Sequence, residues 1–116
     1  MTLLWLDDLR DPKDALWSEW ITNSGYDLSE LNIVWVKNYV EFIEHINTEG
    51  LPDVIGFDHD LGESDEMTGF DCAKWLVDYC IDNEKDLPKW LIQSANPVGA
   101  KNISGLLISY LKFKNK

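Results

Sequence analysis

The chain has few of the features that would assign it to several common classes of protein. Among its 116 residues there are only two cysteines, Cys72 and Cys80. Eight positions apart in one expected helix, they would lie about 12 Å from each other, too far for a disulfide bond. No apolar run approaches the ~20 residues of a membrane helix, and Met1 leads into strand-like sequence without a basic signal-peptide segment. We therefore expect reduced thiols, no membrane association and a cytoplasmic location.

Basic residues are also scarce, with 10 Lys and Arg against 21 Asp and Glu, which gives a formal net charge of −11. This charge excludes binding to duplex nucleic acid through a basic surface. No Cys/His zinc spacing, phosphate-loop glycine pattern or dinucleotide fingerprint is present. The length fits a single domain, 1–116, and 45% hydrophobic residues can form one core. A cation site or a basic partner remains compatible with the acidic charge.

Four short apolar runs alternate with four amphipathic segments. The runs at 2–7, 32–37, 53–58 and 89–94 predict strands. Helices are expected at 12–23, with Asp11 as N-cap, at 38–49, at 68–83 and from 96–97 onward. Alternation of this kind predicts an α/β fold: a small doubly wound parallel sheet of about four strands with helices on both faces.

Polar residues follow three of the expected strands. Because ligands of doubly wound folds bind beyond the carboxyl ends of the strands, we expect these residues to converge at one edge. They are Asp7, Asp8 and Arg10 after the first strand, Asp58, His59 and Asp60 after the third, and Gln93, Ser94 and Asn96 after the fourth.

Four carboxylates brought together would either raise their pKa values or share a cation. Oxygen ligands favour a hard cation, so Asp7, Asp8, Asp58 and Asp60 are candidate ligands of Mg²⁺, with Mn²⁺ as the alternative. Each could instead simply cap a helix or a turn. Free N–H groups at the start of the last helix would add an anion-binding site.

The candidate phosphate-binding residues are Arg10, Ser94 and Asn96. Among the candidate catalytic residues Asp58, His59, Asp60 and Ser94, His59 could move a proton or could point away along the extended chain. The nine-residue loop at 59–67 is long for this kind of connection. Its acidic residues are either a solvated surface or part of a flap over the site: Glu63, Asp65 and Glu66.

Several of these motifs resemble receiver domains of two-component signalling. The acidic pair Asp7-Asp8, Asp58 at the end of a strand, Thr68-Gly69-Phe70 and Ser94 carry this resemblance. It implies a receiver-like, flavodoxin-like fold, with Mg²⁺ at Asp7 and Asp8 and a phosphoacceptor at Asp58. The usual fifth strand, and the lysine that follows it, have no counterpart in sequence order.

The fuller set of motifs is similar to the cyclic-phosphate-processing receiver domains of bacteria and phages, a family associated with RNA repair. Its motifs here are WLDDxR at 5–10, FDHDLG at 57–62, Thr68-Gly69 and QSANP at 93–97. The family usually has His where this chain has Gln93, which puts a proton-transfer role there in doubt.

Two functions follow from these resemblances. The first is a metal-binding domain that binds or hydrolyses a phosphate ester, such as a cyclic phosphate at a nucleic-acid end or on a small molecule. The second is a non-catalytic signalling or protein-binding module in which Asp58 accepts a phosphoryl group or an acidic patch docks a partner. The Asp58-x-Asp60 spacing also resembles the nucleophile motif of haloacid-dehalogenase-type phosphatases, although that motif normally opens its domain.

Overall fold

The computed structural model of the chain describes residues 1–62 and 67–114. Strands and helices alternate along the whole described chain, as the sequence predicts. In chain order the elements are β1 (Thr2–Leu6), α1 (Ala15–Asn23), the short 3₁₀ helix η1 (Leu28–Glu30), β2 (Asn32–Val36), α2 (Tyr39–Glu49), β3 (Val54–Phe57), α3 (Gly69–Asp82), β4 (Lys89–Ile92) and α4 (Pro97–Lys114).

The four strands form one parallel sheet in the order β2-β1-β3-β4. Leu6, the last residue of β1, lies beside Val36 of β2 and Phe57 of β3. The carboxyl ends of these three strands are therefore level. The strand order reverses at β1, because β2 lies on one side of it and β3 on the other. The residues that follow β1 and β3 therefore meet at the carboxyl edge of the sheet.

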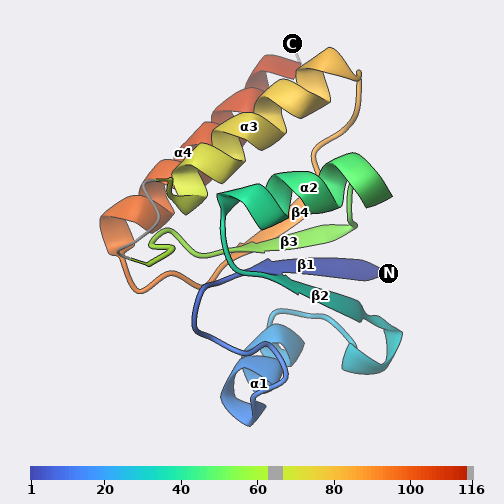
Figure 1. Cartoon of the computed structure of the whole chain (residues 1–116), viewed down its shortest axis with the longest axis vertical. Coiled ribbons are helices and arrows are strands. Elements are labelled where there is room, and N and C mark those ends of the chain that lie inside the picture. Colours follow the sequence, from blue (N-terminus) through green and yellow to red (C-terminus); the bar gives the residue numbers. More distant parts are fainter. Residues whose placement is uncertain (63–66, 115–116) are drawn as a thin grey trace.

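The two faces of the sheet are covered differently (Figure 1). Helices α2, α3 and α4 lie on one side, and α1 lies on the other. The first face buries an aliphatic and aromatic core that includes Phe42, Phe57 and Ile103. The second face is packed mainly with tryptophan, because Trp5 contacts Trp17 and Trp20 of α1 at ring-centroid distances of 6.1 and 6.0 Å. The predicted doubly wound architecture is confirmed.

Local capping explains where the helices begin. Asn38 caps α2, and Thr68 with Asp71 forms a capping box at α3. The prediction for the first helix was wrong: it begins at Ala15 with Asp14 as N-cap. Asp11 instead accepts a hydrogen bond from the Lys13 N–H, which forms a separate turn before the helix.

Each strand also ends one or two residues earlier than predicted, so the polar residues that follow the strands belong to loops. The 3₁₀ helix η1 was not predicted, since one turn carries too little periodicity to be recognised. In the two described ranges, no helix is both long and apolar enough to cross a membrane.

Candidate metal centre

Asp7 begins the turn that follows β1, and its side chain organises that turn. Its Oδ1 accepts hydrogen bonds from the backbone N–H groups of Leu9 and Arg10, at 3.0 and 2.8 Å. Its own N–H donates to the carbonyl oxygen of Val36, which continues the sheet pairing by one residue. Asp7 is fully buried. One carboxylate oxygen is thus used by the turn, and the other, Oδ2, lies beside the Arg10 guanidinium.

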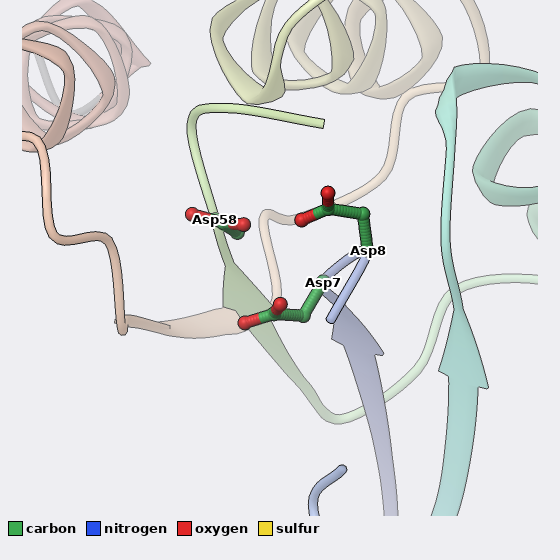
Figure 2. Close-up of side chains that lie close together, drawn as sticks. All are labelled: Asp7, Asp8 and Asp58. Carbon is green, nitrogen blue, oxygen red and sulfur yellow. The ribbon is translucent and has the colours of Figure 1, made fainter. Parts of the chain in front are cut away.

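Asp58 follows β3 and meets Asp7 from the neighbouring strand. Its N–H donates to the Leu6 carbonyl oxygen, and only 4% of the residue is exposed. One carboxylate oxygen from each of Asp7, Asp8 and Asp58 lies within 4.8 Å of the others, and Figure 2 shows the three side chains facing a common space. We call these three residues the acidic cluster. The predicted convergence of carboxylates from two strands is therefore observed.

The acidic cluster is electrostatically strained. Burial, followed by the negative charge of Asp7, raises the pKa of Asp58 to about 7, and the charge of Arg10 opposes this rise. Three oxygen donors at this spacing form a set that a hard divalent cation accepts. A bound cation would favour the ionised form of Asp58, because its charge offsets the repulsion. The residues present therefore fit a divalent cation.

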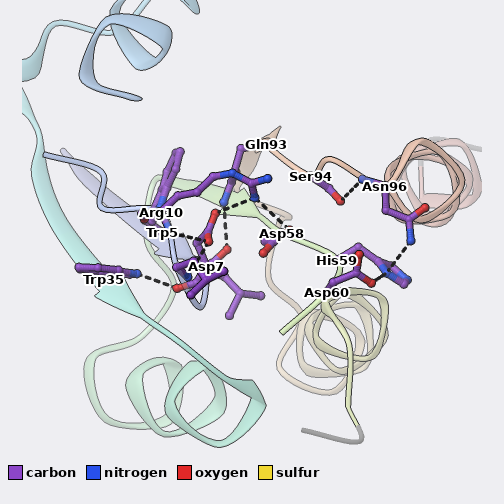
Figure 3. Close-up of polar contacts among 12 residues, drawn as sticks. Trp5, Asp7, Arg10, Trp35, Asp58, His59, Asp60, Gln93, Ser94 and Asn96 are labelled. Carbon is purple, nitrogen blue, oxygen red and sulfur yellow. Dashed lines mark hydrogen bonds and ion pairs between the residues drawn. The ribbon is translucent and has the colours of Figure 1, made fainter. Parts of the chain in front are cut away.

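Arg10 is the positive group beside the acidic cluster. Its Nη1 lies 3.3 Å from Asp7 Oδ2 and 3.5 Å from Asp58 Oδ1. Figure 3 draws Arg10 beside both carboxylates. Its guanidinium carbon lies 5.2 Å from the ring centroid of Trp17, a cation–π distance. A quarter of the side chain is exposed. Arg10 therefore acts as a counter-ion within the site while remaining accessible to an anion.

A pocket of about 550 Å³ opens beside these groups. The charged residues of its wall are Asp8, Arg10, Asp58 and Asp60. Its apolar wall includes Leu9 and Leu61. The described lining does not include His59, Ser94 or Asn96. The lining residues within the described part of the chain are Asp8, Leu9, Arg10, Asp58, Asp60, Leu61, Gly62, Met67, Thr68 and Ala95.

His59 and Asp60 form a second polar group with Asn96, separate from the acidic cluster. His59 Nδ1 lies 2.9 Å from Asp60 Oδ1, and Asn96 Nδ2 lies 3.5 Å from the same nitrogen. The hydrogen bond with His59 lowers the pKa of Asp60 below its ordinary value. The acidic cluster does not include Asp60, whose role as a metal ligand stays a prediction.

The start of α4 packs closely against this second group. A Cβ atom on Gly99 would lie 2.3 Å from His59 Cγ, so glycine is required for this approach. The Gly99 N–H donates to Asn96 Oδ1, and the Asn96 N–H donates to Ser94 Oγ, both at 3.0 Å. Ser94 and Asn96 thus satisfy backbone groups at the helix start, and their phosphate contacts stay predictions.

Sequence reasoning missed two residues that support the turn after β1, Trp35 and Trp5. The indole N–H groups of Trp35 and Trp5 donate to the carbonyl oxygens of Asp7 and Arg10, at 2.7 and 2.9 Å. Gln93 is buried and donates from Nε2 to the Leu6 carbonyl oxygen at 2.9 Å. The tryptophans fit the apolar pattern of their strands, so nothing in the sequence signals these polar contacts. The loop residues Glu63, Asp65 and Glu66 fall outside the described residues.

A parallel sheet of order β2-β1-β3-β4 with an acidic cluster beyond β1 and β3 is a receiver-like arrangement. The chain belongs to the family described as the Cyclic-phosphate processing Receiver domain, which matches residues 2–109. The predicted family resemblance is thereby confirmed. No curated protein matches the chain.

Two solved structures share the fold at 17% sequence identity. One is the N-terminal domain of a response regulator/sensory box/GGDEF 3-domain protein from Carboxydothermus hydrogenoformans, with a TM-score of 0.55 over 97% of this chain and 92% of that one. The other is a yeast Spc42 trimeric coiled-coil segment fused to another structure, with a TM-score of 0.56 over 97% and 77% of the two chains. At this identity the likeness establishes the receiver fold alone.

Proposed function

We propose that this domain binds a divalent cation, Mg²⁺ or Mn²⁺, at the acidic cluster and uses it to hold and hydrolyse a phosphate ester. The observation that carries the proposal is the approach of Asp7, Asp8 and Asp58 to within 4.8 Å of one another at the carboxyl edge of the sheet. Crowded carboxylates on a buried edge are costly without a counter-charge. A site that retains them is best explained by a cation that they bind.

Each residue of the site has a distinct role in this proposal. A divalent cation at the acidic cluster would supply Lewis-acid activation of a phosphoryl group. Arg10 lies beside the acidic cluster and lines the pocket, so its guanidinium can bind phosphoryl oxygens. Asp60 also lines the pocket and is hydrogen-bonded to His59, which suits this pair to proton transfer at the ester oxygen.

The proposed substrate is a cyclic phosphate, at the end of a nucleic acid or on a nucleotide. The family description supports the phosphate chemistry. The pocket supports a ligand with a charged end and an apolar part, because Leu9 and Leu61 line it together with Arg10 and Asp58. A nucleoside cyclic phosphate has this character. Ser94 and Asn96, at the start of α4, are proposed to contact its phosphate oxygens.

Hydrolysis of 2′,3′-cyclic nucleotides in Mg²⁺ or Mn²⁺ tests the enzymatic proposal. Wild-type protein and the Asp58→Asn variant should be purified in parallel and compared by chromatographic product analysis. The proposal expects product from the wild-type protein, and loss of turnover in the variant. Background rates for both proteins would reject catalysis.

The second candidate function is a receiver-type module in which Asp58 accepts a phosphoryl group. Asp58 favours it because its carboxylate lines the pocket and lies 3.5 Å from a guanidinium that could pair with the added phosphate. Incubation with acetyl phosphate and Mg²⁺, followed by intact mass measurement, decides between the two. A phosphate adduct that disappears in Asp58→Asn supports the module, and an unchanged mass rejects it.

A further inference from the structure

We propose that Trp35 and Trp5 are positioning residues for the cation site, acting through their indole N–H groups on the turn at 7–10. This inference rests on the proposed cation binding and adds a role for two residues that do not contact the cation. The turn supplies two carboxylates of the acidic cluster and the Arg10 guanidinium. Its geometry therefore decides whether the ligand atoms meet.

The two tryptophans hold opposite ends of the turn. Trp35, in β2, donates to the carbonyl oxygen of Asp7 at 2.7 Å, and Trp5, in β1, donates to that of Arg10 at 2.9 Å (Figure 3). Both bonds join the turn to residues of the sheet. The hydrogen bonds from Leu9 and Arg10 to Asp7 Oδ1 fix the shape of the turn internally. The indoles tie the turn to β2 and β1, and this adds to the Arg10–Asp58 ion pair that links the turn to the segment after β3.

Such anchoring is needed because repulsion acts on the same turn. Asp7 and Asp58 are both buried and their carboxylates approach within 4.8 Å, so their like charges repel each other, with one cationic side chain, Arg10, paired to both. Cation sites need their ligands held within about 0.5 Å of the binding geometry. Two hydrogen bonds to backbone carbonyl oxygens oppose displacement of the turn by this repulsion. The two indole bonds therefore occupy no carboxylate oxygen of the acidic cluster.

The neighbours of Trp5 and Trp35 leave room for an indole ring at each position. A Cβ atom on Gly56 would lie 2.8 Å from the Trp5 ring, so the glycine leaves the space in which this indole lies. Lys37 Nζ lies 4.5 Å from the ring centroid of Trp35 and covers it. Phenylalanine could keep much of this apolar contact at either position but has no N–H to donate.

The experiment compares Trp35→Phe and Trp5→Phe with Trp20→Phe as a matched control. Trp20 packs against Trp5 in the same aromatic group, and within the described residues its indole makes no hydrogen bond. Mg²⁺ affinity is measured by isothermal titration calorimetry, and the free energy of unfolding by urea titration. Mn²⁺ electron paramagnetic resonance reports the symmetry of the bound ion.

We expect a Kd for Mg²⁺ about fivefold higher in each of Trp35→Phe and Trp5→Phe, in line with one lost hydrogen bond, together with a broadened Mn²⁺ spectrum. Trp20→Phe should lose comparable stability yet keep the wild-type Kd and spectrum. Should Trp35→Phe fail to fold, benzothienylalanine at position 35 keeps the ring shape and removes only the N–H group. The same fivefold loss is then expected.

The possible outcomes distinguish a failure of the positioning role of Trp35 and Trp5 from a failure of cation binding itself. Wild-type protein that binds neither Mg²⁺ nor Mn²⁺ would reject the proposed function itself. Wild-type protein that binds the ions, with Trp35→Phe and Trp5→Phe matching its affinity and spectrum, would overturn the positioning role alone. Equal losses in all three Phe variants would also overturn it, since packing rather than the N–H groups would then be responsible.

Discussion

Asp58 and Asp60 lie two residues apart on the same segment, yet their carboxylates have opposite electrostatic environments. Asp58 is 4% exposed and lies beside Asp7, and burial with that neighbouring charge raises its pKa to about 7. The Asp60 side chain is 69% exposed, and the hydrogen bond with His59 lowers its pKa. One carboxylate therefore lacks sufficient counter-charge, whereas the other already has a partner.

The difference shows that the number of carboxylates after a strand does not define a cation site. Asp58 joins the acidic cluster because its N–H continues the ladder to β1, which aligns it with Asp7. Asp60 has left the sheet and turns toward the start of α4, where Asn96 and His59 lie. A carboxylate that is buried beside a second carboxylate, as Asp58 is, is stabilised by a bound cation. A carboxylate with a polar partner, as Asp60 has in His59, does not need one.

The largest expected effect is on cation affinity in Asp58→Asn. An amide removes the negative charge shared by the acidic cluster, so the Kd for Mg²⁺ should rise by about 100-fold or more. Calorimetric titration of both proteins at pH 8 measures this change. An affinity within threefold of the wild type would show that the cation, if bound, does not depend on Asp58.

The second expected effect is on stability as a function of pH in the metal-free protein. Because the pKa of Asp58 is raised above its unfolded value, its contribution to the free energy of unfolding is full below about pH 4 and is lost as pH rises through about 7. Asp58→Asn lacks this loss. Its free energy of unfolding should therefore exceed that of the wild type by about 4 kcal/mol at pH 8 and match it near pH 4.

Urea unfolding at several pH values measures this difference. Addition of Mg²⁺ at pH 8 should narrow it, because the cation stabilises only the protein that binds it. A stability difference between the two proteins that is independent of pH would contradict the assignment of a strained Asp58 carboxylate.

A smaller effect is expected from Arg10→Gln, which removes the positive charge between Asp7 and Asp58. Mg²⁺ should bind about threefold more tightly, because the guanidinium no longer repels it, while a nucleoside monophosphate should bind the Mg²⁺-loaded protein more weakly. Arg10→Lys keeps the charge and serves as the control for cation affinity. Weaker Mg²⁺ binding in Arg10→Gln would show that Arg10 chiefly supports the turn.

The smallest effect on cation affinity is expected for Asp60→Asn. Its carboxylate is exposed and hydrogen-bonded to His59, so the Kd for Mg²⁺ should stay within about twofold of the wild type. Turnover of a cyclic phosphate, by contrast, should fall if the His59–Asp60 pair moves a proton. Calorimetry measures the Mg²⁺ affinity, and product analysis on the same preparation measures the turnover. A large loss of Mg²⁺ affinity would place Asp60 among the ligands.

The sequence was sufficient for the parallel sheet and for the meeting of Asp7 with Asp58. Continuous apolar strands and the rule for strand ends determine both, and neither depends on side-chain detail. The start of the first helix was mispredicted because Asp11 and Asp14 are both good caps, and only the turn at Lys13 decides between them.

The contacts of Trp5, Trp35 and Asp60 could not be predicted from local patterns. An indole in an apolar strand gives the same periodic signal whether or not its N–H finds a carbonyl oxygen in another loop. The direction of a side chain two residues beyond a strand depends on how the loop turns, and here on the close approach of His59 to Gly99. Such information lies in tertiary packing.

The most direct test of the central claim is a crystal of the protein soaked with Mn²⁺ and measured at a wavelength that gives anomalous scattering from manganese. We expect one strong anomalous peak within bonding distance of oxygens from Asp7, Asp8 and Asp58, and no such peak in crystals of Asp58→Asn. A peak bound elsewhere, or a wild-type acidic cluster that stays without one at saturating Mn²⁺, would contradict the claim.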